Sequence, residues 1–295
     1  MKIAYDPTPL HPTHRLLDFP SATADLGYDF LQLTPHPDFA THFRYPKMDR
    51  DLIRRFKRAV EAAGITVPAL LPVQRISWPD EAKRAAAVKN FRRVIEIAVD
   101  LGVKTINTEF SGRPEAFEDS EESFYRSMDE LLPIIEREGM RLNIDPHPDD
   151  FVEDGHEAWR VLRGLDSASV GFVYVASHTF HYGDCLETLA DELGERLNAV
   201  YISDAFDHRA SNGLRYIANP PTTSARVHQH LKVGDGDVDF DALFATLRRT
   251  GFLDREDGLI VSNVFGENEN NDAVSRYQKQ RIDKLIASSS ADTRD

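Results

Sequence analysis

The sequence predicts a single-domain (β/α)8 TIM barrel. Three observations predict it: a chain of 295 residues of which 41% are apolar, a regular alternation of short apolar runs with amphipathic segments, and no Pro/Gly/Ser-rich linker between them. We expect the barrel to cover residues 1–288 and a polar tail to follow over residues 289–295. An open, doubly wound α/β sheet is the alternative that the same alternation allows.

Eight short runs of apolar or β-branched residues are the candidate strands. Most are continuous apolar runs, as expected for parallel strands that are buried on both faces. They cover Lys2–Asp6, Phe30–Pro35, Thr66–Leu71, Thr105–Phe110, Arg141–His147, Gly171–His178, Asn198–Asp204 and Leu259–Val264.

Amphipathic segments between these runs predict the helices. The two clearest apolar faces consist of Val88, Phe91, Ile95 and Val99, and of Phe124, Met128, Leu131 and Ile135. Gly102 and Gly139 follow these two faces and supply the helix stops. Weaker helical segments cover residues 13–26, 49–63, 155–163, 184–194, 238–250 and 270–288.

Charge and cysteine content exclude several classes of protein. The 35 Lys and Arg against 49 Asp and Glu give a net charge of −14, which repels a phosphate backbone and argues against nucleic acid as the main partner. The single cysteine, Cys185, cannot form an intramolecular disulfide, so we expect a reducing, cytoplasmic location. No apolar run approaches the roughly 20 residues of a membrane span, so a membrane partner is not expected.

Polar side chains gather at the C-terminal ends of the candidate strands. Any one of them is typical of a helix cap or a turn, but in a barrel these ends converge on one face, where active sites lie. The residues are Asp6, His36, Gln74, Arg75, Glu109, Asp145, His147, His178, Asp204 and Asn263.

A subset of these residues has the chemistry of a divalent metal site. Carboxylates and neutral imidazoles suit Mn, Zn, Co, Fe or Mg. We expect the ligands to come from Glu109, Asp145, His147, His178 and His230, with His228 the least favoured further member.

The most specific motif is Val227–Phe240, with the sequence VHQHLKVGDGDVDF. Its His-x-His spacing places two imidazoles on one side of an extended segment, and the glycines allow a tight turn before a helix. The Gly-x-Gly lacks the third glycine of a nucleotide-binding fingerprint. A pair of loop histidines without a metal is the alternative interpretation.

The remaining histidines and tryptophans receive a plainer interpretation. His11, His14, His42 and His156 are expected at the surface or as caps. Trp78 and Trp159 are expected to pack, although Trp78 follows the third strand closely enough to line a pocket. Arg75 and Arg215 could bind an anion or sugar hydroxyls, or form surface ion pairs.

Several stretches resemble the xylose-isomerase-like barrel superfamily, the sugar phosphate isomerase/epimerases, which includes sugar epimerases, inosose-processing enzymes and endonuclease IV-type AP endonucleases. The resemblance extends over the whole chain and is strongest to members of inositol catabolism. The stretches are Lys2–Asp6, Thr34–Pro37 (TPHP), Ala87–Gly112, Arg126–Pro133 (RSMDELLP), His178–Phe180 (HTF), Arg215–Pro221 (RYIANPP) and Val227–Phe240.

The family pattern carries over only in part. It implies Asp145, His178 and His230 as metal ligands, whereas other positions of the pattern hold Val175, Tyr201 and Ser262 or Asn263. These departures remove most of the trinuclear zinc set of the endonuclease and leave the usual epimerase site incomplete. The resemblance therefore implies Glu109 and His147 as replacement ligands.

The resemblance and the donor set together imply a metal-dependent isomerase or epimerase for a keto-cyclitol (inosose) or keto-sugar. Asp145 or His208 would remove the proton α to the carbonyl, and the metal would act as a Lewis acid. The residues expected to contact this small-molecule substrate are His36, Arg75, Asp204, Arg215 and Asn219. A lyase or dehydratase on a similar substrate and a non-catalytic sugar-binding barrel are the alternatives, and a homo-oligomer is compatible with either.

Overall fold

One sheet of parallel strands forms the centre of the computed structural model, which describes residues 1–180, 186–207, 209, 216–217, 227–264 and 270–289. The strand order in this sheet is β2-β1-β9-β6-β5-β4-β3. The strands are β1 (Lys2–Tyr5), β2 (Phe30–Leu31), β3 (Thr105–Glu109), β4 (Arg141–Asp145), β5 (Val170–Val175), β6 (Leu197–Ile202) and β9 (Leu259–Ser262). A separate antiparallel pair consists of β7 (Tyr216–Ile217) and β8 (Val227–His228).

Residues 66–71 close the sheet into a barrel. They bridge both edge strands in parallel orientation: the amide of Leu71 donates to the carbonyl of Leu33 (2.8 Å), and the amide of Leu70 donates to the carbonyl of Thr105 (3.0 Å). The predicted eightfold barrel is therefore confirmed, and the open sheet is excluded.

This eighth segment forms isolated bridges and not a continuous ladder. Pro68 lies within it and Pro72 follows it, and neither has an amide hydrogen to donate. Proline therefore interrupts the regular pairing within the segment and directly after it.

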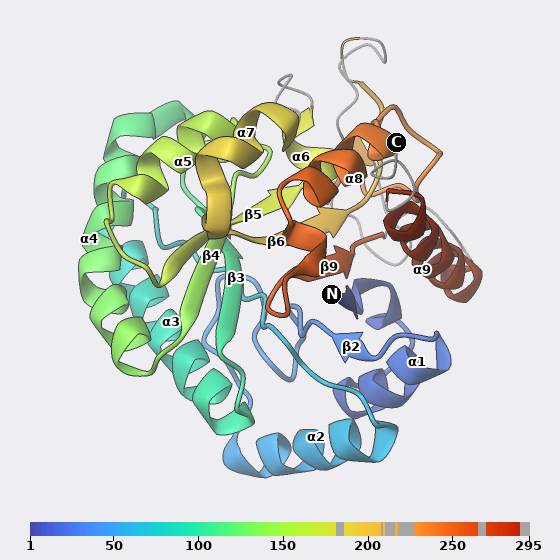
Figure 1. Cartoon of the computed structure of the whole chain (residues 1–295). Coiled ribbons are helices and arrows are strands. Elements are labelled where there is room, and N and C mark those ends of the chain that lie inside the picture. Colours follow the sequence, from blue (N-terminus) through green and yellow to red (C-terminus); the bar gives the residue numbers. More distant parts are fainter. Residues whose placement is uncertain (181–185, 208, 210–215, 218–226, 265–269, 290–295) are drawn as a thin grey trace.

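Helices surround the strands in a ring (Figure 1). They are α1 (Phe19–Asp25), α2 (Arg50–Ala63), α3 (Glu81–Leu101), α4 (Phe117–Arg137), α5 (Gly155–Arg163), α6 (Ala176–Thr179), α7 (Leu186–Leu193), α8 (Phe240–Arg249) and α9 (Asn271–Ser288). Short 3-10 helices cover Thr8–Leu10, Leu16–Asp18, Pro114–Ala116, Gly194–Arg196 and Phe252–Asp254. No helix in these described ranges is both long and apolar enough to cross a membrane.

Three sequence-based expectations for the elements need correction. The predicted strand over 171–178 ends at Val175, and His178 lies in the helical turn α6. The helix predicted over 13–26 begins only at Phe19, where Pro20 favours a first turn. Val99 was expected on the buried face of α3, yet its side chain is 40% exposed.

A chain of amide side chains crosses the interior of the barrel. Asn198 donates to Asn143 (2.8 Å), Asn143 donates to Asn107 (2.9 Å), and Asn107 donates to Gln32 (2.9 Å). The hydroxyl of Tyr201 also donates to Gln32 (2.6 Å). All five side chains are buried, and their pairing compensates for the loss of water.

We predict that two identical substitutions on α3 have different effects. Val88 is 2% exposed, so Val88→Ala should lower the free energy of unfolding by about 2 kcal/mol through lost burial and a cavity. Val99→Ala is the matched control and should change it by less than about 0.5 kcal/mol. Urea unfolding measures both, and equal losses would contradict the packing of this helix.

Candidate metal centre

A cavity of about 430 Å³ lies over the C-terminal ends of the barrel strands. Parallel strands bring these ends together, as the sequence analysis assumed. The polar side chains that line the cavity include Asp6, His11, His42, Glu109, Asp145, His147, His178, Tyr201, His228, His230 and Asn263.

Two adjacent strands supply the carboxylates. Glu109 ends β3 and Asp145 ends β4, and the two residues are direct partners in the β3–β4 register. His147 follows two residues after Asp145, and its Nε2 lies 3.6 Å from Oε1 of Glu109. The end of this strand pair therefore gathers three of the predicted ligands.

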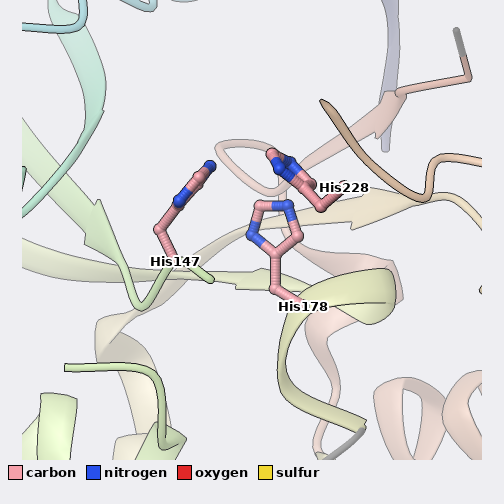
Figure 2. Close-up of side chains that lie close together, drawn as sticks. All are labelled: His147, His178 and His228. Atoms are coloured by element: carbon pink, nitrogen blue, oxygen red, sulfur yellow. The ribbon is translucent and has the colours of Figure 1, made fainter. Parts of the chain in front are cut away.

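Three imidazoles converge at the centre of the cavity (Figure 2). His147, His178 and His228 each offer one nitrogen, and these nitrogens all lie within 4.8 Å of one another. The ring of His228 is 4.4 Å from each of the other two ring centroids. His228, the least favoured candidate in the sequence, is thus a central member of the cluster.

His230 faces the same cluster through an arrangement that fixes its tautomer. Its Nδ1 lies 3.0 Å from the backbone carbonyl of Asn263, which can only accept, so Nδ1 carries the hydrogen. In His178, Nδ1 lies 3.3 Å from Oδ2 of Asp145, and when that carboxyl group is ionised the hydrogen lies on Nδ1. In that state both Nε2 atoms can bind a metal ion.

Nε2 of His178 and Nε2 of His230 are 3.2 Å apart. Burial lowers the pKa of His230 to about 3, so its ring is neutral. Two acceptor nitrogens at this distance repel one another unless a hydrogen or a cation bridges them. Neutral imidazole nitrogens, each with its other nitrogen held by an oxygen acceptor, form a donor set that fits a divalent metal.

The buried acid beside His178 has an altered acidity. Burial raises the pKa of Asp145 well above its usual value, and the nearby charges of Glu109 and Asp150 raise it further. Strongly perturbed carboxyl groups in a cavity are typical of proton-transfer sites. Asp145 is therefore a candidate for proton transfer as well as for orienting His178.

Two histidines that were expected at the surface line the cavity. Burial lowers the pKa of His11 to about 4, and its ring stacks on Phe19 at 5.4 Å. Burial lowers the pKa of His42; the charge of Glu109 opposes this shift, whereas that of His147 adds to it. His156 lies on the outside as expected, in an ion pair with Glu192.

Asp204, predicted to contact the substrate, has its carboxylate directed at a turn of the backbone. It accepts hydrogen bonds from the amides of Ala205 (2.9 Å), Gly234 (2.8 Å) and Val238 (3.1 Å). A Cβ on Gly236 would lie only 2.4 Å from its Oδ1. The glycines of the GDGD motif thus form a turn around Asp204, and a contact of Asp204 with substrate stays a prediction.

None of the other residues predicted to contact the substrate is among the described lining residues of the cavity. His36 lies behind His11, with ring centroids 5.4 Å apart, and its Nδ1 accepts from the amide of Asp38. Arg75 stacks against Phe43, which does line the cavity. His208, Arg215 and Asn219 lie outside the described residues.

Sequence reasoning missed Asp150, which joins the ends of two strands. Its buried carboxylate accepts from the amides of Ser111 (2.5 Å), Gly112 (2.6 Å) and Phe151 (2.7 Å). Ser111 has a left-handed backbone with φ 57°, a conformation that such bonds must hold in place. Asp150 thereby fixes the loop after β3 to the loop that carries His147.

A model of the xylose isomerase-like TIM barrel family matches residues 20–285. This chain belongs to the xylose isomerase-like TIM barrel family. Val175, Tyr201 and Asn263, which the resemblance implies at positions where the family pattern differs, line the cavity. Ser262, the alternative to Asn263, is not among the described lining residues.

Relatives of this family member have names from sugar and cyclitol chemistry. An inosose isomerase from Bacillus licheniformis is 25% identical over 179 residues, which are 59% of this chain and 60% of that protein. The L-ribulose-5-phosphate 3-epimerase UlaE from Salmonella paratyphi C is 22% identical over 77% of this chain and 75% of its own. The structure of the IOLI protein with a zinc atom superposes with a TM-score of 0.73 at 19% identity, covering 98% of this chain and 99% of that one.

Removing the two facing imidazoles should abolish metal retention. We predict that the wild-type protein retains a stoichiometric divalent metal and that the double variant His178→Ala/His230→Ala loses it, because both ligand nitrogens are gone. His156→Ala, a surface histidine in an ion pair, is the control and should keep the metal. Elemental analysis after dialysis decides this, and unchanged metal in the double variant would rule out these ligands.

Asp150→Asn should weaken both the fold and the metal centre. An amide group offers only one accepting oxygen, so a backbone amide among Ser111, Gly112 and Phe151 would face an NH2 group. We expect a loss of about 1–3 kcal/mol in the free energy of unfolding, together with weaker metal binding by calorimetry. Asp154→Asn, at the N-cap of α5, is the matched control, because Asn is an equally good N-cap. Equal behaviour of both variants would contradict this role.

Proposed function

We propose that this protein is a metal-dependent isomerase or epimerase that acts on a keto-cyclitol such as an inosose, or on a keto-sugar. The proposal is supported by family membership, by the inosose isomerase and the ketose-phosphate epimerase among the relatives, and by the cavity at the strand ends. The observation that carries it is the 3.2 Å approach of two lone-pair-bearing nitrogens, Nε2 of His178 and of His230.

The ligands would come from the imidazoles around this point, namely His147, His178, His228 and His230, with Oε1 of Glu109 3.6 Å from Nε2 of His147. Nitrogen donors favour Mn, Fe, Co or Zn over Mg. When bound, such an ion supplies a Lewis acid for a carbonyl oxygen of the substrate. The zinc of the IOLI protein supports a site of this kind in the same fold.

Asp145 is our choice for the base that removes the proton α to the carbonyl. It lines the cavity, and burial raises the pKa of its carboxyl group, which makes the ionised form a stronger base than an exposed carboxylate. Glu109, its register partner on β3, lines the same cavity and would return the proton. His208 stays the alternative base.

Exchange of the α-hydrogen with solvent tests the reaction. With Mn²⁺ in D₂O, we expect deuterium at the α-carbon of an inosose or keto-sugar, detected by NMR or mass spectrometry. Asp145→Asn should slow this exchange by about 100-fold or more, since it removes a positioned base. Asp154→Asn, which changes a carboxylate far from the cavity lining, should leave the rate unchanged.

The product of the same incubation separates the rival reactions. An epimer or isomer supports the proposal, whereas loss of water from an exchanged substrate would identify a lyase or dehydratase. Full metal occupancy with no deuterium in any keto-cyclitol or keto-sugar would overturn both, and a non-catalytic sugar-binding barrel would then be favoured.

A further inference from the structure

Three cationic side chains gather around one indole ring beside the cavity. The guanidinium carbon of Arg75 lies 4.3 Å from the ring centroid of Trp78, and the guanidinium carbon of Arg113 and Nζ of Lys83 each lie 5.3 Å from it. Each contact is a favourable cation–π interaction. The like charges nevertheless repel one another, in a chain whose net charge is −14.

Arg75 contacts two aromatic rings. Its guanidinium carbon is 4.2 Å from the ring centroid of Phe43 as well as 4.3 Å from that of Trp78. These two contacts restrict where the guanidinium group can lie. A guanidinium group can bind a carboxylate or phosphate through two parallel N–H groups.

The cluster has too few anions for its charge. Among the described residues, no carboxylate forms an ion pair with Arg75 or Lys83, whereas Arg113 pairs with Glu115. Nε of Arg75 is buried without a hydrogen-bond partner in the same set of residues. Arginine side chains elsewhere in this acidic chain do form such pairs, for example Arg54 with Asp51.

Phe43 connects this cluster to the metal centre. It lines the cavity, and 42% of its side chain is exposed. Its left-handed backbone (φ 59°) is held by an amide hydrogen bond to the carbonyl of Val73 (3.0 Å), and Gln74 donates to the carbonyl of Arg44 (3.1 Å). The segment that ends in Arg75 therefore fixes the loop that covers the cavity, and the cationic cluster lies beside it.

We propose that Arg75, assisted by Arg113 and Lys83 around Trp78, forms a subsite for an oxyanion group of the substrate. The group is a phosphate or a carboxylate on the part of the molecule remote from the reacting carbonyl. The assignment of this ligand as a substrate rests on the function proposed above. Three cationic groups with a single carboxylate partner among the described residues favour an anion over the sugar hydroxyls that the sequence also allowed for Arg75.

Trp78 gives a local readout of this subsite that is independent of metal chemistry. The chain has two tryptophans, so Trp159→Phe leaves Trp78 as the single reporter, in contact with Arg75. We would titrate the EDTA-treated protein with neutral L-ribulose, L-ribulose 5-phosphate, the keto acid D-tagaturonate and inorganic phosphate, and follow Trp78 fluorescence and calorimetric heat.

We expect at least one anionic sugar to bind about tenfold or more tighter than L-ribulose, as a charge-assisted hydrogen-bond pair predicts. Comparing L-ribulose 5-phosphate with D-tagaturonate then shows whether the subsite prefers a phosphate or a carboxylate. Arg75→Gln should reduce the affinity for that sugar to the level of L-ribulose and leave L-ribulose binding unchanged. Arg54→Gln, which removes the same charge from an exposed helix position, should leave both affinities unchanged.

Two results would overturn the subsite: equal affinity for neutral and anionic sugars, or equal losses in Arg75→Gln and Arg54→Gln. These results are distinct from failure of the proposed reaction. If anionic sugars bind through Arg75 but no substrate exchanges its α-hydrogen, the subsite stands and the isomerase proposal falls.

Discussion

The backbone hydrogen bonds of residues 66–71 close the ring of strands, and the site depends on that closure. Leu70 and Leu71 connect the neighbouring strands on either side, so the C-terminal ends of all eight segments must meet on one face. Without this connection, β2 and β3 would be the edges of an open sheet. Glu109 would then lie at an edge, and His42 would have no opposite wall.

The convergence of strand ends explains what the sequence could predict. Glu109, Asp145, His147 and His178 come at the ends of predicted strands, and all four line the cavity, as does His230 of the His-x-His motif. The apolar runs can be recognised without knowledge of distant contacts. The roles of these residues stay predictions, but the common location of the first four follows from the parallel arrangement.

The rest of the site depends on contacts between residues far apart in the chain. His42 lies over the cavity because the neighbouring Phe43 is bound to Val73, about thirty residues later. The sequence around Asp150 is typical of a turn, yet its carboxylate accepts hydrogen bonds from amides 38 and 39 residues away. His228 gains its central position only when a loop returns to the cavity. No local pattern in the sequence encodes such contacts.

The row of buried amides through the barrel has a consequence for how this interior can vary. Asn107 and Asn143 each donate through the NH2 group to one neighbour and accept through the oxygen from the other, so the row has a direction. Replacing one of these two residues by an apolar residue leaves an unpaired polar group on each side, and replacing the other one as well adds no further unpaired group. Substitutions at these two positions are therefore non-additive, and the second replacement costs less stability than the first.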